Sequence, residues 1–207
     1  MYQNRDLRFY ANIIYNDAEY RGRNVEYWTP DGLDSKDGLM GGFHAVETGY
    51  CIRKFMREDY NFDTERASTP YMSIRLAEIY LNYAEALYHT GDEINARKYL
   101  NMIRNRVHMP SVETSGQNLL DDIRHERRIE LCFEGLHRFF DVRRWMTADV
   151  ELNKPFEGIS FTKDPDTGAL SYSIHTQEPR IFKPEYYYLP IPLGEINRTD
   201  LEQNWGY

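Results

Sequence analysis

The sequence contains no continuous apolar run of about 18 residues, the length that a helix needs to cross a membrane. Residues 1–6 contain no apolar signal core either, so any targeting segment would have been removed. The only two cysteines, Cys51 and Cys132, match no metal-ligand spacing. Each lies among apolar neighbours, which predicts two buried free thiols rather than a disulfide. We therefore expect a soluble body with no disulfide and no metal site.

Positive charge is also lacking. The formal net charge is −8, whereas a protein that binds a phosphate backbone normally presents a basic surface, so a nucleic-acid partner is disfavoured. A neutral sugar would be indifferent to this charge. The sequence has no P-loop, no dinucleotide-binding glycine pattern and no Gly-x-Ser-x-Gly motif. It therefore predicts no cofactor and no catalytic residue.

The middle of the chain has a helical pattern. Apolar residues recur at helical spacing over 73–89 and 93–107, and Thr90-Gly91-Asp92 between them is typical of a helix end followed by a new cap. The small residues Ala84 and Ala96 lie where two helices must approach closely, as in a tetratricopeptide-type hairpin. Two more helices are predicted at 118–133 and 136–147. Residues 73–147 would then form a helical core.

The rest of the chain is rich in turn residues. We expect a strand or short buried segment at 7–15 and a strand at 49–57, with loop-rich segments at 16–48 and 150–207. Asp166-Thr167-Gly168, between two apolar runs, predicts a β-hairpin. The fold class is therefore mostly α, with tetratricopeptide-like helical hairpins, long irregular loops and minor β-hairpin content. Residues 1–207 are expected to form a single domain.

Residues 124–145 hold many charged side chains and allow three interpretations. Paired carboxylates, Glu126 or Glu130 with Asp141, are what a glycosidase needs. His125, Glu126 and His137 can bind a metal, although the spacing of the zinc-protease helix is absent. The favoured interpretation is structural, because charges within an apolar helix stripe must be paired. Residues 124–144 carry six arginines and four carboxylates, and the expected partners are Arg138, Arg143 and Arg144.

Aromatic side chains in the 16–48 loop suggest a ligand site. Aromatic rings can stack on the flat C–H faces of sugars, while amide and carboxylate groups hydrogen-bond to the hydroxyls. The alternative is that these rings anchor the loop to the core. The candidate ligand-binding residues are Tyr20, Asn24, Tyr27, Trp28 and Asp31.

Seven stretches resemble the SusD/RagB family, over most of residues 49–207. They are Gly49–Phe55, Arg75–Ala86 with Leu100–Arg106, Ile123–Leu131, Glu134–Trp145, and Tyr188–Ile196 with Gln203–Tyr207. Members are usually about twice this length, so the chain is expected to be the C-terminal portion of such a protein. No sugar-contacting motif of the family transfers residue by residue, so the site prediction depends on the loop aromatics alone.

The resemblance implies a binding protein and not an enzyme. Family members lie on the outer membrane of Bacteroidetes, are held by a lipid on an N-terminal cysteine that this chain does not contain, and are exposed at the cell surface. Each delivers glycans, or in some cases peptides, to a SusC-like TonB-dependent transporter. The expected function is therefore glycan binding and delivery. The alternative is a helical-repeat module that binds protein and no glycan.

Overall fold

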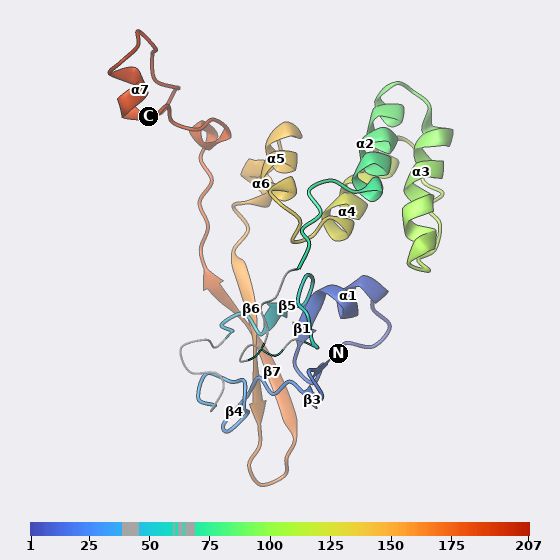
Figure 1. Cartoon of the computed structure of the whole chain (residues 1–207), viewed down its shortest axis with the longest axis vertical. Coiled ribbons are helices and arrows are strands. Elements are labelled where there is room, and N and C mark those ends of the chain that lie inside the picture. The colour runs from blue at the N-terminus through green and yellow to red at the C-terminus, as the bar shows by residue number, and fades with distance from the viewer. Residues whose placement is uncertain (39–45, 60, 62–63, 65–68) are drawn as a thin grey trace.

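A computed structural model describes residues 1–38, 46–59, 61, 64 and 69–207. The helices between residues 76 and 151 gather at one end, and a long β-hairpin extends away from them (Figure 1). The C-terminal segment forms an arm that stands apart from the helices. A mainly helical fold with minor β-hairpin content is confirmed. None of the helices in the described part of the chain is long and apolar enough to span a bilayer.

Helices α2 (Leu76–His89) and α3 (Glu93–Arg106) form the predicted hairpin. Gly91 has a φ of 87°, which suits a residue just after a helix end, and Asp92 caps α3 by accepting a hydrogen bond from the Asn95 amide at 3.1 Å. Ala84 and Ala96 are both fully buried, as their place at the helix crossing predicts. The small side chains allow close approach of the two backbones, and larger side chains around them fill the core.

Helix α4 (Gly116–Glu130) packs against both α2 and α3. The core between the three helices consists of apolar side chains with at most 9% exposure: Leu81, Ala84, Ala96, Leu100, Ile103, Val112, Leu119, Ile123 and Leu131. Helices α5 (His137–Arg144) and α6 (Ala148–Glu151) follow. Val142 and Ala148 join Phe182 in a second, smaller core.

Within the residues that the structure describes, the strands form three small sheets. β1 (Ile13–Tyr15) pairs with β5 (Tyr50–Ile52), and β2 (Glu19–Tyr20) pairs with β3 (Arg23–Asn24). The third sheet has the order β4-β6-β7, with β4 (Trp28–Thr29) parallel to β6 (Phe156–Lys163) and β7 (Leu170–Glu178) antiparallel to it. β6 and β7 are the predicted hairpin. The C-terminal arm holds a 3-10 turn (Pro184–Tyr187) and α7 (Leu193–Ile196).

Several local predictions are wrong. Of residues 7–15, predicted as a strand or short buried segment, only 13–15 form a strand, β1. Residues 7–12 form α1 (Leu7–Asn12), because Asp6 caps them by accepting a hydrogen bond from the Arg8 amide at 2.9 Å. The predicted strand at 49–57 is limited to the three residues of β5. Cys51 is exposed and Cys132 partly buried, although both are free thiols as predicted. The part of the predicted loop at 39–45 lies outside the described residues.

Candidate functional site

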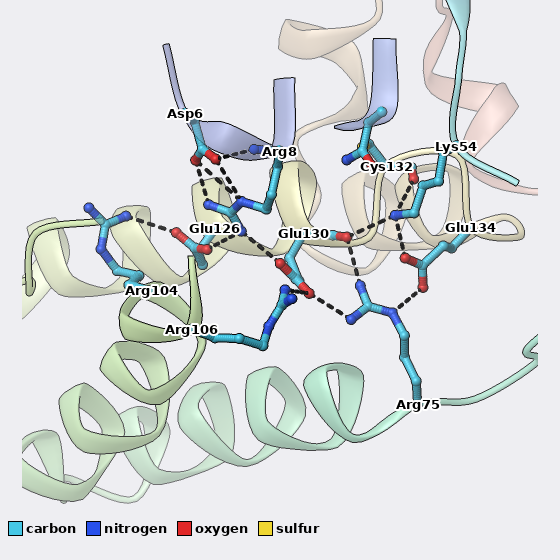
Figure 2. Close-up of polar contacts among 11 residues, drawn as sticks. Asp6, Arg8, Lys54, Arg75, Arg104, Arg106, Glu126, Glu130, Cys132 and Glu134 are labelled. Atoms are coloured by element: carbon cyan, nitrogen blue, oxygen red, sulfur yellow. Dashed lines mark hydrogen bonds and ion pairs between the residues drawn. The ribbon is translucent and has the colours of Figure 1, made fainter. Parts of the chain in front are cut away.

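Three carboxylates of the 124–145 motif, those of Glu126, Glu130 and Glu134, lie inside a network of ion pairs (Figure 2). Glu126 is fully buried and Glu130 is 2% exposed, so each needs compensating charge. Arg8 and Arg104 reach Glu126, the latter at 2.8 Å between Nη1 and Oε2. Arg8, Arg75 and Arg106 converge on Glu130 at 2.8, 2.6 and 2.7 Å. Two buried carboxylates are thus surrounded by four guanidinium groups.

The same network completes the C-terminal end of α4, where carbonyl groups lack partners within the helix. Arg75 Nη2 donates to the backbone oxygen of Glu130 at 2.7 Å. Lys54 Nζ donates to the backbone oxygens of Glu130 and Cys132 at 3.2 and 3.0 Å. Glu134 accepts from Lys54 and from Arg75. A helix end that would carry unpaired carbonyls is therefore satisfied by cations, which also suit the negative end of the helix dipole.

Asp141 belongs to a second network. Its Oδ2 accepts from Arg127 Nε at 2.6 Å, and its Oδ1 accepts from Arg144 Nη2 at 3.2 Å. Arg144 also pairs with Glu85 at 2.6 and 2.9 Å, and the Trp145 indole donates to the same carboxylate at 2.7 Å. This arrangement joins α2, α4 and α5 through buried charge.

These contacts oppose the glycosidase hypothesis. Burial raises the pKa of Glu130, but the guanidinium groups of Arg75 and Arg8 outweigh burial and hold this pKa below its ordinary value. A general acid needs the opposite shift, so that it keeps a proton near neutral pH. Glu126 and Asp141 pair with arginines as well, as the structural interpretation requires.

The predicted partners of these carboxylates are only partly correct. Arg144 does bind Asp141, but Arg138 pairs with Glu151 at 2.7 Å, and Arg143 lies over the Phe139 ring at 3.6 Å. Glu126 and Glu130 are neutralised by arginines outside 124–144. Those arginines come from α1, α3 and the segment before α2. The charge pattern of α4 alone does not show which arginines from other elements pair with its carboxylates.

The metal hypothesis also finds no support in the described residues. Glu126 is occupied by Arg8 and Arg104, and His137 Nε2 lies 3.9 Å from a carboxylate oxygen of Glu78. Within the ranges that the structure describes, no group of three histidine, cysteine or carboxylate side chains can hold a metal ion.

The predicted ligand residues divide between two places. Tyr20 and Asn24 lie on the β2–β3 ribbon, where the Asn24 amide donates to Asp17 Oδ1 at 2.9 Å. Trp28 lies in β4, and exposed Asp31 lies in the turn after it, with a φ of 68°. Gly32 N donates to the Trp28 carbonyl at 3.1 Å and closes this turn. The turn thus presents an indole and a carboxylate three residues apart.

Tyr27 lies in sequence between the β2–β3 ribbon and the turn after β4, and it is more buried than Tyr20, the other tyrosine predicted to bind ligand. Its amide donates to Asn16 Oδ1 at 2.9 Å, and Asn16 is itself buried. Burial raises the pKa of the Tyr27 hydroxyl, and the nearby Cys51 and Asp34 add to this effect. Burial raises the pKa of Tyr20 as well. Tyr27 therefore fits an anchor of the loop better than a ligand contact.

The sheet places two further aromatic residues, Phe161 and Tyr172, in one row with Trp28. The sequence alone did not indicate either of them as part of the site. Trp28 is in register with Phe161 of β6, and Phe161 is in register with Tyr172 of β7. Residues paired in this way present their side chains on the same face. Phe161 is 4% exposed whereas Tyr172 is 58% exposed, and Lys163 Nζ lies 4.6 Å from the centroid of the Trp28 ring. Half-buried Trp28 and exposed Tyr172 thus flank a buried aromatic residue.

The chain is similar to known proteins over its whole length. Residues 1–207 match the SusD family. A SusD-like protein from Bacteroides fragilis NCTC 9343 is 36% identical with a TM-score of 0.84, and the match covers 100% of this chain and 39% of that chain. A SusD-like carbohydrate binding protein from the same organism is 30% identical with a TM-score of 0.76, over 94% of this chain and 41% of that chain.

A third solved structure, surface glycan-binding protein A from Bacteroides thetaiotaomicron, shares the fold at 24% identity and a TM-score of 0.59, over 100% of this chain and 39% of that chain. The chain therefore spans about two fifths of the length of these relatives. No curated protein is similar enough to count as a match. The family match over the whole chain and the first two structures show that this chain belongs to the SusD family.

Proposed function

We propose that this chain binds glycan through the turn at Trp28, without breaking any bond. The supporting observation is the row Trp28–Phe161–Tyr172 across the β4-β6-β7 sheet, together with exposed Asp31 in the turn that follows Trp28. Aromatic rings and a nearby hydrogen-bonding group are the chemistry that sugar recognition needs. Tyr20 and Asn24 on the β2–β3 ribbon are the remaining proposed contacts, and Tyr27 holds the loop in place.

Family membership supports the chemical class of ligand. One relative with 30% identity is a SusD-like carbohydrate binding protein. The carboxylates that a glycosidase would need are held by arginines, which supports capture rather than hydrolysis. The resemblance to SusD/RagB proteins further supports delivery to a SusC-like TonB-dependent transporter, at the outer surface of the outer membrane, by a full-length protein that carries an N-terminal lipid.

A glycan-array screen followed by calorimetry tests the proposal. Trp28→Ala is expected to weaken binding of the best glycan at least tenfold, about 1.4 kcal/mol. Trp205→Ala is the matched control, because Trp205 is 68% exposed on the C-terminal arm and is not in the proposed site. Equal affinity of both variants would remove Trp28 from the site. Absence of binding to any oligosaccharide would favour the alternative, a helical module that binds only protein.

A further inference from the structure

One face of α4 carries charged and polar side chains and lies away from the helical core. Asp121, Arg124, His125 and Arg128 recur at three- and four-residue spacing, which places them on one side of the helix, whereas buried Ile123 lies on the core side. Together with α5 and α6, this face lines a cavity of about 240 Å³, and the remaining lining residues are Arg138, Trp145, Thr147 and Glu151. Sites for drug-sized ligands measure roughly 300–1,000 Å³, so this cavity suits a smaller group.

The cavity holds more positive than negative charge. Arg124, Arg128 and Arg138 line it, whereas only Asp121 and Glu151 contribute carboxylates, and the whole chain has a formal net charge of −8. Burial lowers the pKa of the Arg138 guanidinium, and the nearby charge of Arg128 lowers this pKa further, although Glu151 opposes the shift. A guanidinium nevertheless stays protonated. The cavity is therefore locally electropositive on an acidic protein, which favours an anion.

The carboxylate of Glu151 cannot neutralise all of these cations. It lies 2.7 Å from Arg138, 3.8 Å from Arg128 and 3.2 Å from Lys154, so three cations share a single negative charge. The Arg128 and Lys154 side chains are each 61% exposed and reach into solvent. An additional anion would thus find cations that are only partly compensated.

Arg124 pairs with no carboxylate of the described residues. Its guanidinium carbon lies 5.0 Å from the centroid of the Trp145 ring, and its Nε is buried without a hydrogen bond. The indole N–H of Trp145 donates to Glu85 at 2.7 Å, which fixes the ring that Arg124 contacts. Exposed Asp121, the second carboxylate of the cavity, accepts a hydrogen bond from the Gln117 amide at 2.8 Å. Arg124 is therefore a fixed positive charge without a counter-ion.

We infer that the cavity lined by α4, α5 and α6 binds a small oxyanion, a carboxylate or a sulfate group, either free or carried by a sugar. The planar forks of Arg124 and Arg128 can each donate two parallel hydrogen bonds to such a group. His125 and Thr147 add neutral polar groups to the lining, which suit the hydroxyls of a sugar acid. The inference does not rest on the glycan site proposed at Trp28.

Calorimetry with the whole chain tests the inference. The probes are sodium galacturonate, sodium sulfate and galactose, which is the neutral counterpart of galacturonate. We expect galacturonate to bind at least tenfold more tightly than galactose, and its affinity to fall as salt rises from about 50 to about 500 mM, because salt screens the charges. Arg124→Gln and Arg128→Gln should each weaken galacturonate binding at least tenfold. Arg198→Gln is the matched control and should not change it, because the Arg198 side chain is 73% exposed on the C-terminal arm.

The second arginine variant separates loss of binding from loss of folding. The Arg128 side chain is mostly exposed, so its replacement should leave the melting temperature unchanged. Sulfate bound as tightly as galacturonate would assign the site to the oxyanion alone, and tighter binding of galacturonate would show that the sugar ring adds contacts; both results support the inference.

Equal affinity for galacturonate and galactose would refute the inference, and so would an affinity that both arginine variants retain. Either result would leave the glycan proposal standing, because that proposal is tested at Trp28.

Discussion

Replacement of Glu130 by alanine tests the charge network most directly. The substitution removes a carboxylate that three arginines share, at 2.8 Å from Arg8, 2.6 Å from Arg75 and 2.7 Å from Arg106. Breaking a buried ion pair by removing one partner costs about 3–5 kcal/mol, because the remaining charge stays buried without compensation. The loss expected for this variant within that range depends on which other ion pairs and solvent contacts the three arginines retain.

Each arginine retains part of its compensation. Arg8 still pairs with Asp6 and Glu126, Arg75 still pairs with Glu134, and the Arg106 side chain is 57% exposed, so water can solvate it. The expected loss in free energy of unfolding is therefore near the lower end, about 3 kcal/mol. Glu195→Ala is the control, since Glu195 pairs with Arg198 at the surface, where such a pair contributes less than about 1 kcal/mol.

Urea unfolding followed by tryptophan fluorescence measures both variants. A Glu130→Ala protein as stable as the Glu195→Ala protein would contradict the view that this carboxylate neutralises buried cations. Loss of a hydrolytic activity with unchanged stability would contradict it more strongly, because it would return Glu130 to a catalytic role.

Three further predictions concern packing, thiol chemistry and acid. Ala84→Leu should destabilise the chain by about 1–3 kcal/mol in urea unfolding because the helix crossing has no room, whereas Ala86→Leu, at an exposed position of the same helix, should change stability by less than about 0.5 kcal/mol. Exposed Cys51 should react with a thiol reagent at pH 8 much faster than Cys132, whose pKa is raised by burial; equal rates would contradict the described burial. The pKa of Glu130 is lower in the folded state than in the unfolded state, so the ionised carboxylate stabilises the fold fully above about pH 4.3. This stabilisation should be lost as the pH falls through the folded-state pKa. The difference in free energy of unfolding between wild type and Glu130→Gln should therefore shrink as the pH falls below about 4.3.

The elements that can be predicted from the sequence are those stabilised by residues close together in the chain. The α2–α3 hairpin could be predicted because helical periodicity, Gly91 and Asp92 all lie within one short stretch. Helix α4 could be predicted because Leu119 and Ile123 recur at helical spacing on one face. The β6–β7 hairpin could be predicted from its turn. In each case the residues that decide the structure are neighbours in sequence.

The remaining features depend on contacts between distant residues. Arg8 meets Glu126 across 118 residues, and no pattern near either residue identifies the partner. Parallel pairing of Trp28 with Phe161 is equally remote, so the contribution of Tyr172 to this sheet face could not be predicted. Residues 7–12 were misassigned because their apolar spacing suits either a strand or a short helix, and the Asp6 cap decides in favour of the helix.

The buried charges also determine where the proposed binding turn lies. Arg8 precedes the 16–38 loop in sequence and Lys54 follows β5, and both are fixed to the C-terminal half of α4 by ion pairs or carbonyl contacts. An apolar contact at these positions could be as stable, but it would accept several arrangements of the two segments. Guanidinium and ammonium groups that must meet particular oxygens allow fewer arrangements. The network therefore orders both ends of the region that carries Trp28, and a turn that is already ordered loses less conformational entropy when it binds a glycan.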